Sequence, residues 1–228
     1  DNGRMYSSYA RTHLALGLGR TGGRDFFYDP GTQTLVPYGH HPPGLGLLLA
    51  GWFWLWGNDG PFTARALPAL FHLGSAGLLF AVLRSQYGGA PALLGALAFA
   101  VVPMSSFFGK MPNFEPLVLP FMIGLVTSYW RWAERGRRGW LVLALAIGSI
   151  ATLIDWMILL ALLTVGVDAA WRFAHGRDRR FLGASMACGA VGSLTFLAVA
   201  AWLANGPTGA HALLHPCSIA HIWEAFRS

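Results

Sequence analysis

The sequence carries little charge. Charged residues make up 11% of the 228-residue chain, against about a quarter in soluble domains. Hydrophobic residues make up 54%, and the mean hydropathy is +0.47. A water-soluble domain of this length does not need so apolar a composition. We therefore expect an integral membrane protein.

Lysine and cysteine are also scarce. Fifteen of the sixteen basic residues are Arg, and the net charge is +6. The arginines gather in short joints between apolar segments, where the positive-inside rule explains them more simply than a nucleic-acid partner does. The two cysteines, Cys188 and Cys217, differ in setting and predict neither a disulfide nor a metal site. The sequence also lacks phosphate-binding loops, dinucleotide fingerprints and zinc patterns.

The first forty-three residues form the one long polar stretch. Residues 4–18 mix Tyr, Leu, Arg and His at roughly helical spacing, which predicts an amphipathic helix lying in the membrane interface. Residues 19–39 are rich in Gly and Pro and are expected to be irregular loop. Residues 44–57 are apolar and carry three Trp, but they are shorter than the roughly 20 residues of a span. An interfacial helix is favoured there.

Six apolar segments follow, at about 62–83, 90–108, 116–133, 140–154, 156–171 and 181–203. The expected fold is an all-α integral membrane protein, a multi-spanning helical bundle with a long extracytoplasmic first loop that carries interfacial helices. Residues 1–61 would form this loop, residues 62–203 about six membrane segments and residues 204–228 an extracytoplasmic tail. A first span and a C-terminal region are expected beyond Asp1 and Ser228.

The stretch 140–171 can be divided in two ways. As a single helix it would run about 48 Å at 1.5 Å per residue, too long for one crossing, with Asp155 in mid-membrane. A break at Asp155–Trp156 makes it a hairpin and places nine arginines on one side, which the positive-inside rule makes cytoplasmic. These are Arg84, Arg131, Arg135, Arg137, Arg138, Arg172, Arg177, Arg179 and Arg180. We prefer the hairpin, and the opening loop, the 109–115 joint and Asp155 then face outside.

Two polar motifs in the opening loop are candidates for chemistry. Asp1 and Arg4 combine a carboxylate that can act as a general base with a guanidinium that can bind phosphate. The same two residues also suit a helix N-cap and an unrelated Arg. His40 and His41 precede a Pro-Pro pair that starts a helix, whose N-terminus can hold an anion. They can equally be loop histidines without a ligand.

Two more candidates lie in the joints between apolar segments. Lys110 and Glu115 share a joint stiffened by two prolines, although a snorkelling Lys and a helix-starting Glu explain them equally well. Asp155 is a carboxylate inside a long apolar run, where its desolvation is costly and a functional role is favoured. Asp168 lies one turn from Arg172 and is expected to form a structural pair with it.

Taken in order, these positions resemble a known superfamily. An acidic-x-x-Arg start followed by Tyr (Asp1, Arg4, Tyr6) precedes His-x-Pro-Pro, Arg-Ala-Leu-Pro at residues 65–68, a Pro-x-x-Glu joint and an internal Asp. The order is similar to that of the dolichyl-phosphate-mannose–protein mannosyltransferase and aminoarabinose transferase superfamily, the C-type glycosyltransferases. The resemblance covers about residues 1–173.

The resemblance implies an inverting transfer of one sugar from a polyprenyl-phosphate donor to an extracytoplasmic glycan, lipid or protein. It implies that Asp1 is the catalytic base and that Arg4 and His41 contact the donor phosphate. The expected substrate-binding residues are Arg4, His40, His41, Lys110, Glu115 and Asp155. It is compatible with a divalent metal ion, requires no other cofactor, and places the enzyme among the lipids of a bacterial inner membrane.

Three positions depart from the family pattern. Asn2 stands where a second acid is common, His41 where Lys is usual, and Ile154–Asp155–Trp156 where a Thr-Lys pair is common. Two other classes of function stay open from the sequence. In a transporter or lipid flippase, Asp155 and Asp168 would line a path; in a non-catalytic assembly subunit, the opening loop would be dispensable.

Overall fold

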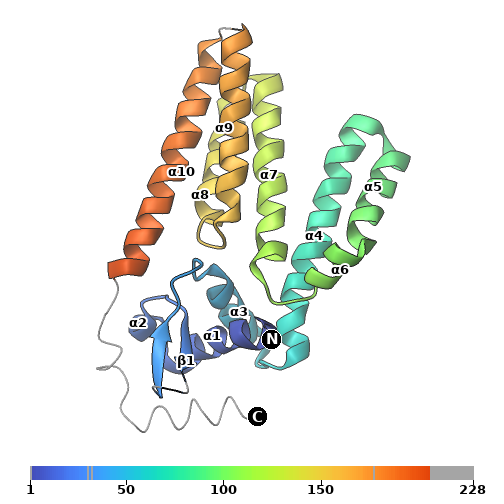
Figure 1. Ribbon diagram of the computed structural model, residues 1–228. Coiled ribbons are helices and arrows are strands. Elements are labelled where there is room, and N and C mark those ends of the chain that lie inside the picture. Colours follow the sequence, from blue (N-terminus) through green and yellow to red (C-terminus); the bar gives the residue numbers. More distant parts are fainter. Residues whose placement is uncertain (1, 30, 32, 177, 206–228) are drawn as a thin grey trace.

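The structure is a computed structural model that describes residues 2–29, 31, 33–176 and 178–205, which contain ten helices and one two-stranded sheet. Figure 1 shows a small N-terminal unit on which the long helices stand. The N-terminal unit comprises α1 (Asn2–Leu16), α2 (Leu18–Thr21), β1 (Phe26–Asp29), β2 (Thr34–Pro37) and α3 (Gly44–Trp56). The long part comprises α4 (Pro61–Tyr87), α5 (Gly89–Val101), α6 (Pro103–Phe108), α7 (Phe114–Arg135), α8 (Arg138–Ala151), α9 (Met157–Gly176) and α10 (Arg179–Asn205).

Helix α1 is amphipathic, as the sequence predicted. Tyr6, Tyr9, Ala10 and His13 are all buried, and their spacing of three or four residues places them on one face of the helix. Helix α1 packs against α3, and Arg11 forms an ion pair with Asp59 at 2.6 Å in the turn before α4. The N-terminal unit is therefore tied to the first long helix.

Residues 19–39 were predicted to be irregular, and this prediction was wrong for three short segments: most of α2 and the two strands. Strands β1 and β2 form an antiparallel hairpin in which Phe26 pairs with Pro37 and Asp29 with Thr34. Their Phe-Phe-Tyr and Thr-Leu-Val sequences contain aromatic and β-branched residues that favour extended structure. Four residues give too short an alternation to stand out among the surrounding glycines.

Among the described residues, three helices are long and apolar enough to cross a membrane by length and composition: α4, α9 and α10. Helices α3, α5 and α8 are shorter apolar helices. Figure 1 shows α7 to α10 standing together, with the α4–α5 pair splayed away from α7. The chain is thus an all-α membrane protein with a small hairpin at one end.

The predicted segment 90–108 is broken in two. Helix α5 ends at Val101 and α6 begins at Pro103, with Val102 between them in an extended conformation (φ −52°, ψ 129°). Proline has no N–H to donate and disfavours a helical conformation of the residue before it. The break therefore follows from Pro103.

The hairpin interpretation of residues 140–171 is confirmed. Helix α8 ends at Ala151 and α9 begins at Met157. At the far end of these helices, Arg180 Nη2 donates to the backbone oxygen of Ala133 at 3.4 Å. The arginine-rich joints after α7 and α9 therefore lie at the same end, and Figure 1 shows the α4–α5 turn there too. Arg177, the ninth arginine of the predicted group, lies outside the described residues.

Asp168 forms the predicted pair with Arg172. Its Oδ2 accepts a hydrogen bond from the Tyr129 hydroxyl at 2.6 Å and from Arg172 Nε at 2.7 Å. These contacts join α7 to α9.

Candidate active site

The His40–His41 segment meets the α8–α9 turn where the N-terminal unit touches the long helices. Trp156 Nε1 donates to the backbone oxygen of His40 at 3.0 Å, although the two residues are 116 apart in the chain. The Gly44 N–H donates to the backbone oxygen of Leu153 at 2.8 Å. The two bonds hold the segment on both sides of its prolines.

His41 and Asp155 form a pair within this junction. His41 Nδ1 lies 3.3 Å from Asp155 Oδ1, and the side chains are 36% and 5% exposed, respectively. A carboxylate can only accept a hydrogen bond, so the hydrogen lies on Nδ1 and Nε2 is the ring nitrogen available to a ligand. The sequence placed these two residues on the same side, and the structure brings them into contact.

Aromatic rings set the orientation of His41. The imidazole stacks on Phe114 with 4.3 Å between ring centroids and 14° between planes, and it lies nearly parallel to Tyr38. Tyr6 packs edge-on against Phe114 at 5.0 Å. Sequence reasoning missed Tyr38 and Phe114 as site residues. The sequence signal that could have identified them is that Tyr38 lies close to His40 and Phe114 directly precedes Glu115.

Two tyrosines of the site have raised pKa values. Burial raises the pKa of Tyr6, and the phenol of Tyr38 and the charges of Glu115 and Asp155 raise it further. Burial also raises the pKa of Tyr38, against the interaction with Tyr6. Both phenols therefore stay protonated as hydrogen-bond donors.

The remaining predicted residues lie in segments at the same end of the molecule as the N-terminal unit (Figure 1), and we call this group the exposed rim. Arg4, His40, Lys110 and Glu115 are all solvent-exposed. Arg4 lies in the first turn of α1 and Glu115 in the first turn of α7. Within the described part of the chain, Arg4, Lys110 and Glu115 form no ion pair. Asp1, the predicted base, lies outside the described residues.

The N-terminus of α3 does not open toward this rim, contrary to the predicted anion site. Gly44, Leu45 and Gly46 are buried, and a Cβ at Gly44 would overlap the backbone of Leu153 and Ile154. The Pro-Pro pair starts the helix as predicted, but the helix begins against the α8–α9 turn. An anion at this site would contact the side chains of His40 and His41 and not the N–H groups at the N-terminus of α3.

A second His–Asp pair lies deeper in the N-terminal unit, and sequence reasoning did not single it out. His13 Nε2 lies 2.9 Å from Asp25 Oδ1, and both side chains are fully buried. Burial raises the pKa of Asp25, while the hydrogen bond and charge of His13 oppose this shift. The signal was the helical stripe of Tyr6, Tyr9 and His13, which predicts an inward-facing imidazole.

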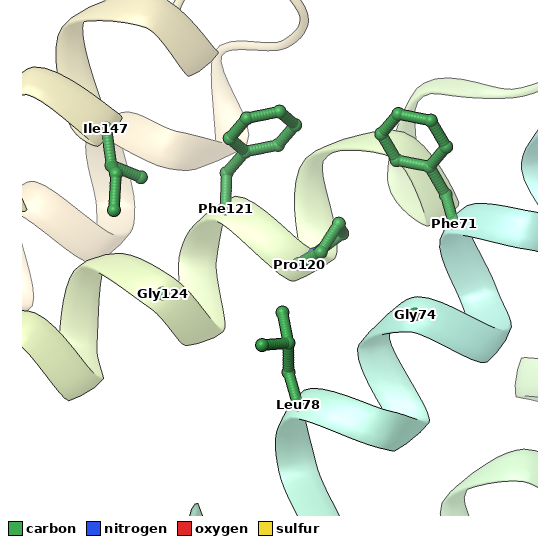
Figure 2. Close-up of a pocket in the computed structure, with 7 residues that line it drawn as sticks. All are labelled: Phe71, Gly74, Leu78, Pro120, Phe121, Gly124 and Ile147. Atoms are coloured by element: carbon green, nitrogen blue, oxygen red, sulfur yellow. The ribbon is translucent and has the colours of Figure 1, made fainter. Parts of the chain in front are cut away.

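An apolar groove of about 480 Å³ opens between α4 and α7. Figure 2 shows Phe71 and Leu78 of α4 facing Pro120 and Phe121 of α7. Its full lining is Phe71, Gly74, Leu78, Pro120, Phe121, Gly124 and Ile147. Each of the two helices contributes a glycine to this lining, which leaves room between them, and the groove offers no charged group to a ligand.

The described residues form neither a metal site nor a line of carboxylates for transport. No group of three or more His, Cys, Asp or Glu side chains there is placed to hold a metal ion. Asp155 lies in the α8–α9 turn, whereas Asp168 is held by Tyr129 and Arg172 within α9. This arrangement does not support a transport path that runs between Asp155 and Asp168.

The chain matches a known protein family over most of its length. Residues 40–204 match the family described as dolichyl-phosphate-mannose-protein mannosyltransferase. The chain belongs to this family. Membership makes the protein a membrane-integral glycosyltransferase of the kind that uses polyprenyl-phosphate sugars, as the resemblance implied. The matched range contains His40, His41 and Asp155, whereas Arg4 precedes it. No curated protein and no solved structure matches the chain.

Proposed function

We propose that the protein is an inverting glycosyltransferase that moves one sugar from a polyprenyl-phosphate donor to a glycan, lipid or protein outside the cytoplasm. The observation that carries this proposal is the His41–Asp155 pair, where a buried carboxylate orients a partly exposed imidazole. Arg4 and Lys110, exposed and without ion pairs in the described part of the chain, supply further positive charge.

The reaction requires positively charged hydrogen-bond donors at the phosphate that leaves. The acceptor hydroxyl attacks the anomeric carbon, the bond from that carbon to the phosphate oxygen breaks, and the polyprenyl phosphate leaves with added negative charge. As an imidazolium, His41 donates from Nδ1 to Asp155 and from Nε2 to this phosphate. Charge-assisted donors held in place before the reaction stabilise such a developing charge.

The acceptor hydroxyl must lose its proton during the attack. Asp1 is the proposed general base, and Asp1→Asn is expected to leave the protein folded while abolishing transfer. Glu115 is exposed in the first turn of α7, directly after Phe114. We assign it to binding hydroxyl groups of the sugar or the acceptor.

The apolar groove between α4 and α7 suits the tail of the donor. On α7 the groove begins at Pro120, six residues after Phe114, which is about 9 Å along the helix. A polyprenyl chain carries no polar group that would need a partner there. The groove in Figure 2 is therefore the proposed path of the tail away from the phosphate.

The orientation follows from the arginines. Arg84 in the last turn of α4 and the arginine clusters around the joints after α7 and α9 lie at the end opposite His41, and the positive-inside rule makes that end cytoplasmic. Residues 1–61 and the tail from 204 then face the outside of a bacterial inner membrane. Of that tail, residues 206–228 lie outside the described part of the chain.

The test is transfer by the full-length protein in liposomes, measured with a panel of radiolabelled polyprenyl-phosphate sugars. His41→Asn keeps a group near Nδ1 for Asp155 but loses Nε2, so transfer should fall about a hundredfold. His41→Gln, whose amide reaches the position of Nε2, should retain more. His175→Gln is the matched control, because His175 is an exposed residue at the other end of α9.

Each outcome decides a different point. Full transfer by His41→Asn on every donor would overturn the assignment of the phosphate site. Failure of the wild type on every polyprenyl-phosphate sugar would overturn the proposed donor class.

A further inference from the structure

We propose that the buried His13–Asp25 pair is a positioning element for His41. It touches no substrate, and it sets the place of the segment that carries the phosphate-binding imidazole. The inference rests on the proposed function, because it takes His41 as a contact of the donor phosphate.

The first observation is that His13 has no free ring nitrogen. Nε2 lies 2.9 Å from Asp25 Oδ1, and Nδ1 lies 3.1 Å from the hydroxyl of Thr21. The side chains of His13 and Asp25 are 1% and 0% exposed, respectively. The imidazole is thus clamped between α2 and the start of the hairpin and is closed to any ligand.

The second observation is that Asp25 contacts the chain on both sides of the His41 segment. Its backbone oxygen accepts a hydrogen bond from the Tyr38 N–H at 2.8 Å. On the other side, its carboxyl packs so closely on Gly46 of α3 that a Cβ there would overlap Oδ1. The residues from 39 to 45 are therefore suspended between two contacts of a single residue.

The third observation is an aromatic route from the same helix to His41. Tyr9 lies one turn before His13 on α1, and its ring packs on Tyr38 with 5.1 Å between centroids. Tyr38 lies nearly parallel to His41 at 6.2 Å. A shift of α1 or of Asp25 would therefore reach the imidazole through side chains as well as through the backbone.

The energetics favour positioning over stability as the role of this pair. Two buried polar groups lose their hydration, and a well-packed apolar pair of the same volume is often at least as stable. Asp25 Oδ2 and the Tyr9 hydroxyl are also buried without a hydrogen-bond partner among the described residues. The pair contributes an oriented contact that an apolar pair cannot supply.

The experiment is a double-mutant cycle on transfer by the full-length protein in liposomes. Asp25→Ala should lower transfer by about 10- to 100-fold, since small displacements of a binding group have large effects on rate. The loss should divide between kcat and the KM of the donor as it does in His41→Ala. Asp25→Asn should retain most of the transfer, because its amide fills the same space and accepts from His13.

The decisive arm is the His41→Ala background. If Asp25 acts through His41, Asp25→Ala should cost less than about twofold there, because the two effects are not additive. Losses that multiply, or a different division between kcat and KM, would overturn the inference. Should Asp25→Ala fail to fold, Thr21→Val gives a second test, because it removes the hydroxyl that contacts His13 Nδ1. The same hydroxyl also donates to the backbone oxygen of Gly17 and accepts from the Gly23 N–H.

The controls separate this inference from the proposed function. Asp178→Asn breaks an exposed ion pair with Arg180 at the other end of the helices and should leave transfer unchanged. Full transfer by His41→Ala would overturn the proposed phosphate site and, with it, the inference. Full transfer by Asp25→Ala alongside a loss in His41→Ala would overturn only the positioning role.

Discussion

At the scale of single residues, the protein uses two His–Asp pairs in opposite ways. Asp155 holds Nδ1 of His41, and Nε2 has no hydrogen-bond partner in the described part of the chain, with the side chain 36% exposed. In the deeper pair both nitrogens of His13 are occupied and the ring is buried. The first arrangement suits binding and the second suits support, although both consist of the same two residue types.

Gly46 gives a prediction at this scale. Gly46→Ala places a methyl group where the Asp25 carboxyl lies, and forcing atoms into a packed interior typically costs about 1–3 kcal/mol. We expect a lower midpoint of thermal unfolding in detergent and reduced transfer.

Gly51→Ala is the matched control on the same helix, because nothing lies within 4 Å of a Cβ there. It should be neutral or slightly stabilising, since Ala favours a helix over Gly by about 1 kcal/mol. Equal effects of the two substitutions would show that the Asp25–Gly46 contact does not constrain the N-terminal unit.

At the scale of elements, short breaks between helices decide which side chains meet. The break between α8 and α9 places Asp155 in a turn that faces the N-terminal unit. Pro103 breaks the segment after α5 and turns α6 aside, before the joint that leads to Phe114. Because Phe114 opens α7 and stacks on His41, the start of that helix is part of the site.

Tyr129 gives a prediction for the packing of α7 on α9. Tyr129→Phe removes the hydrogen bond from its hydroxyl to Asp168, which should lower stability by about 1 kcal/mol. Sugar transfer at a temperature well below unfolding should not change, because the contact lies away from the site. Thermal unfolding and transfer assays on one preparation measure both.

Tyr87→Phe is the control for this substitution, since Tyr87 is exposed at the end of α4. It should alter neither quantity. If Tyr129→Phe lost transfer at a temperature well below its unfolding, a purely structural role for Asp168 would be contradicted.

At the scale of the whole molecule, the two ends of the helices differ in chemistry. One end carries the arginine clusters, where Arg131 lies over Trp140 and Arg180 over Phe181. The other end carries the N-terminal unit, the His41–Asp155 pair and the exposed rim. A donor with a lipid tail and a charged head suits such an arrangement, because the groove between α4 and α7 begins at Pro120, about 9 Å along α7 from Phe114.

Labelling of single cysteines tests the orientation. In a background with Cys188→Ala and Cys217→Ser, Asn58→Cys introduces a thiol in the turn before α4 and Ser85→Cys one beside Arg84. Both positions are exposed. A membrane-impermeant maleimide should label Asn58→Cys in intact spheroplasts and Ser85→Cys only after lysis. The reverse pattern would overturn the proposed extracytoplasmic site.

Much of the architecture could be predicted, because a helix in lipid must be apolar along its length and satisfy its own backbone. The segments, the split at Asp155 and the Asp168–Arg172 pair follow from length, charge and helical spacing. The hairpin of β1 and β2 did not, because its strands are only four residues long. The break at Val102 was missed although Pro103 was its signal.

The candidate site could be predicted in part for a related reason. Grouping the arginines at one end placed His41, Glu115 and Asp155 together at the other, without information on distances. Spacing did not reveal that Asp155 faces His41, or that the start of α3 is buried, since both depend on how the N-terminal unit docks. The Tyr6, Tyr9 and His13 stripe predicts a buried face, but not its partner Asp25.

The sequence by itself determined the class of protein, the helical segments, the two chemically different ends and the family. These follow from the local composition of each segment and from the order of the motifs in the sequence. Only the tertiary structure decided which histidine meets which carboxylate and which ring nitrogen stays open. Those contacts join residues more than a hundred positions apart at the site and twelve apart in its support, and their geometry exists only once the helices have packed.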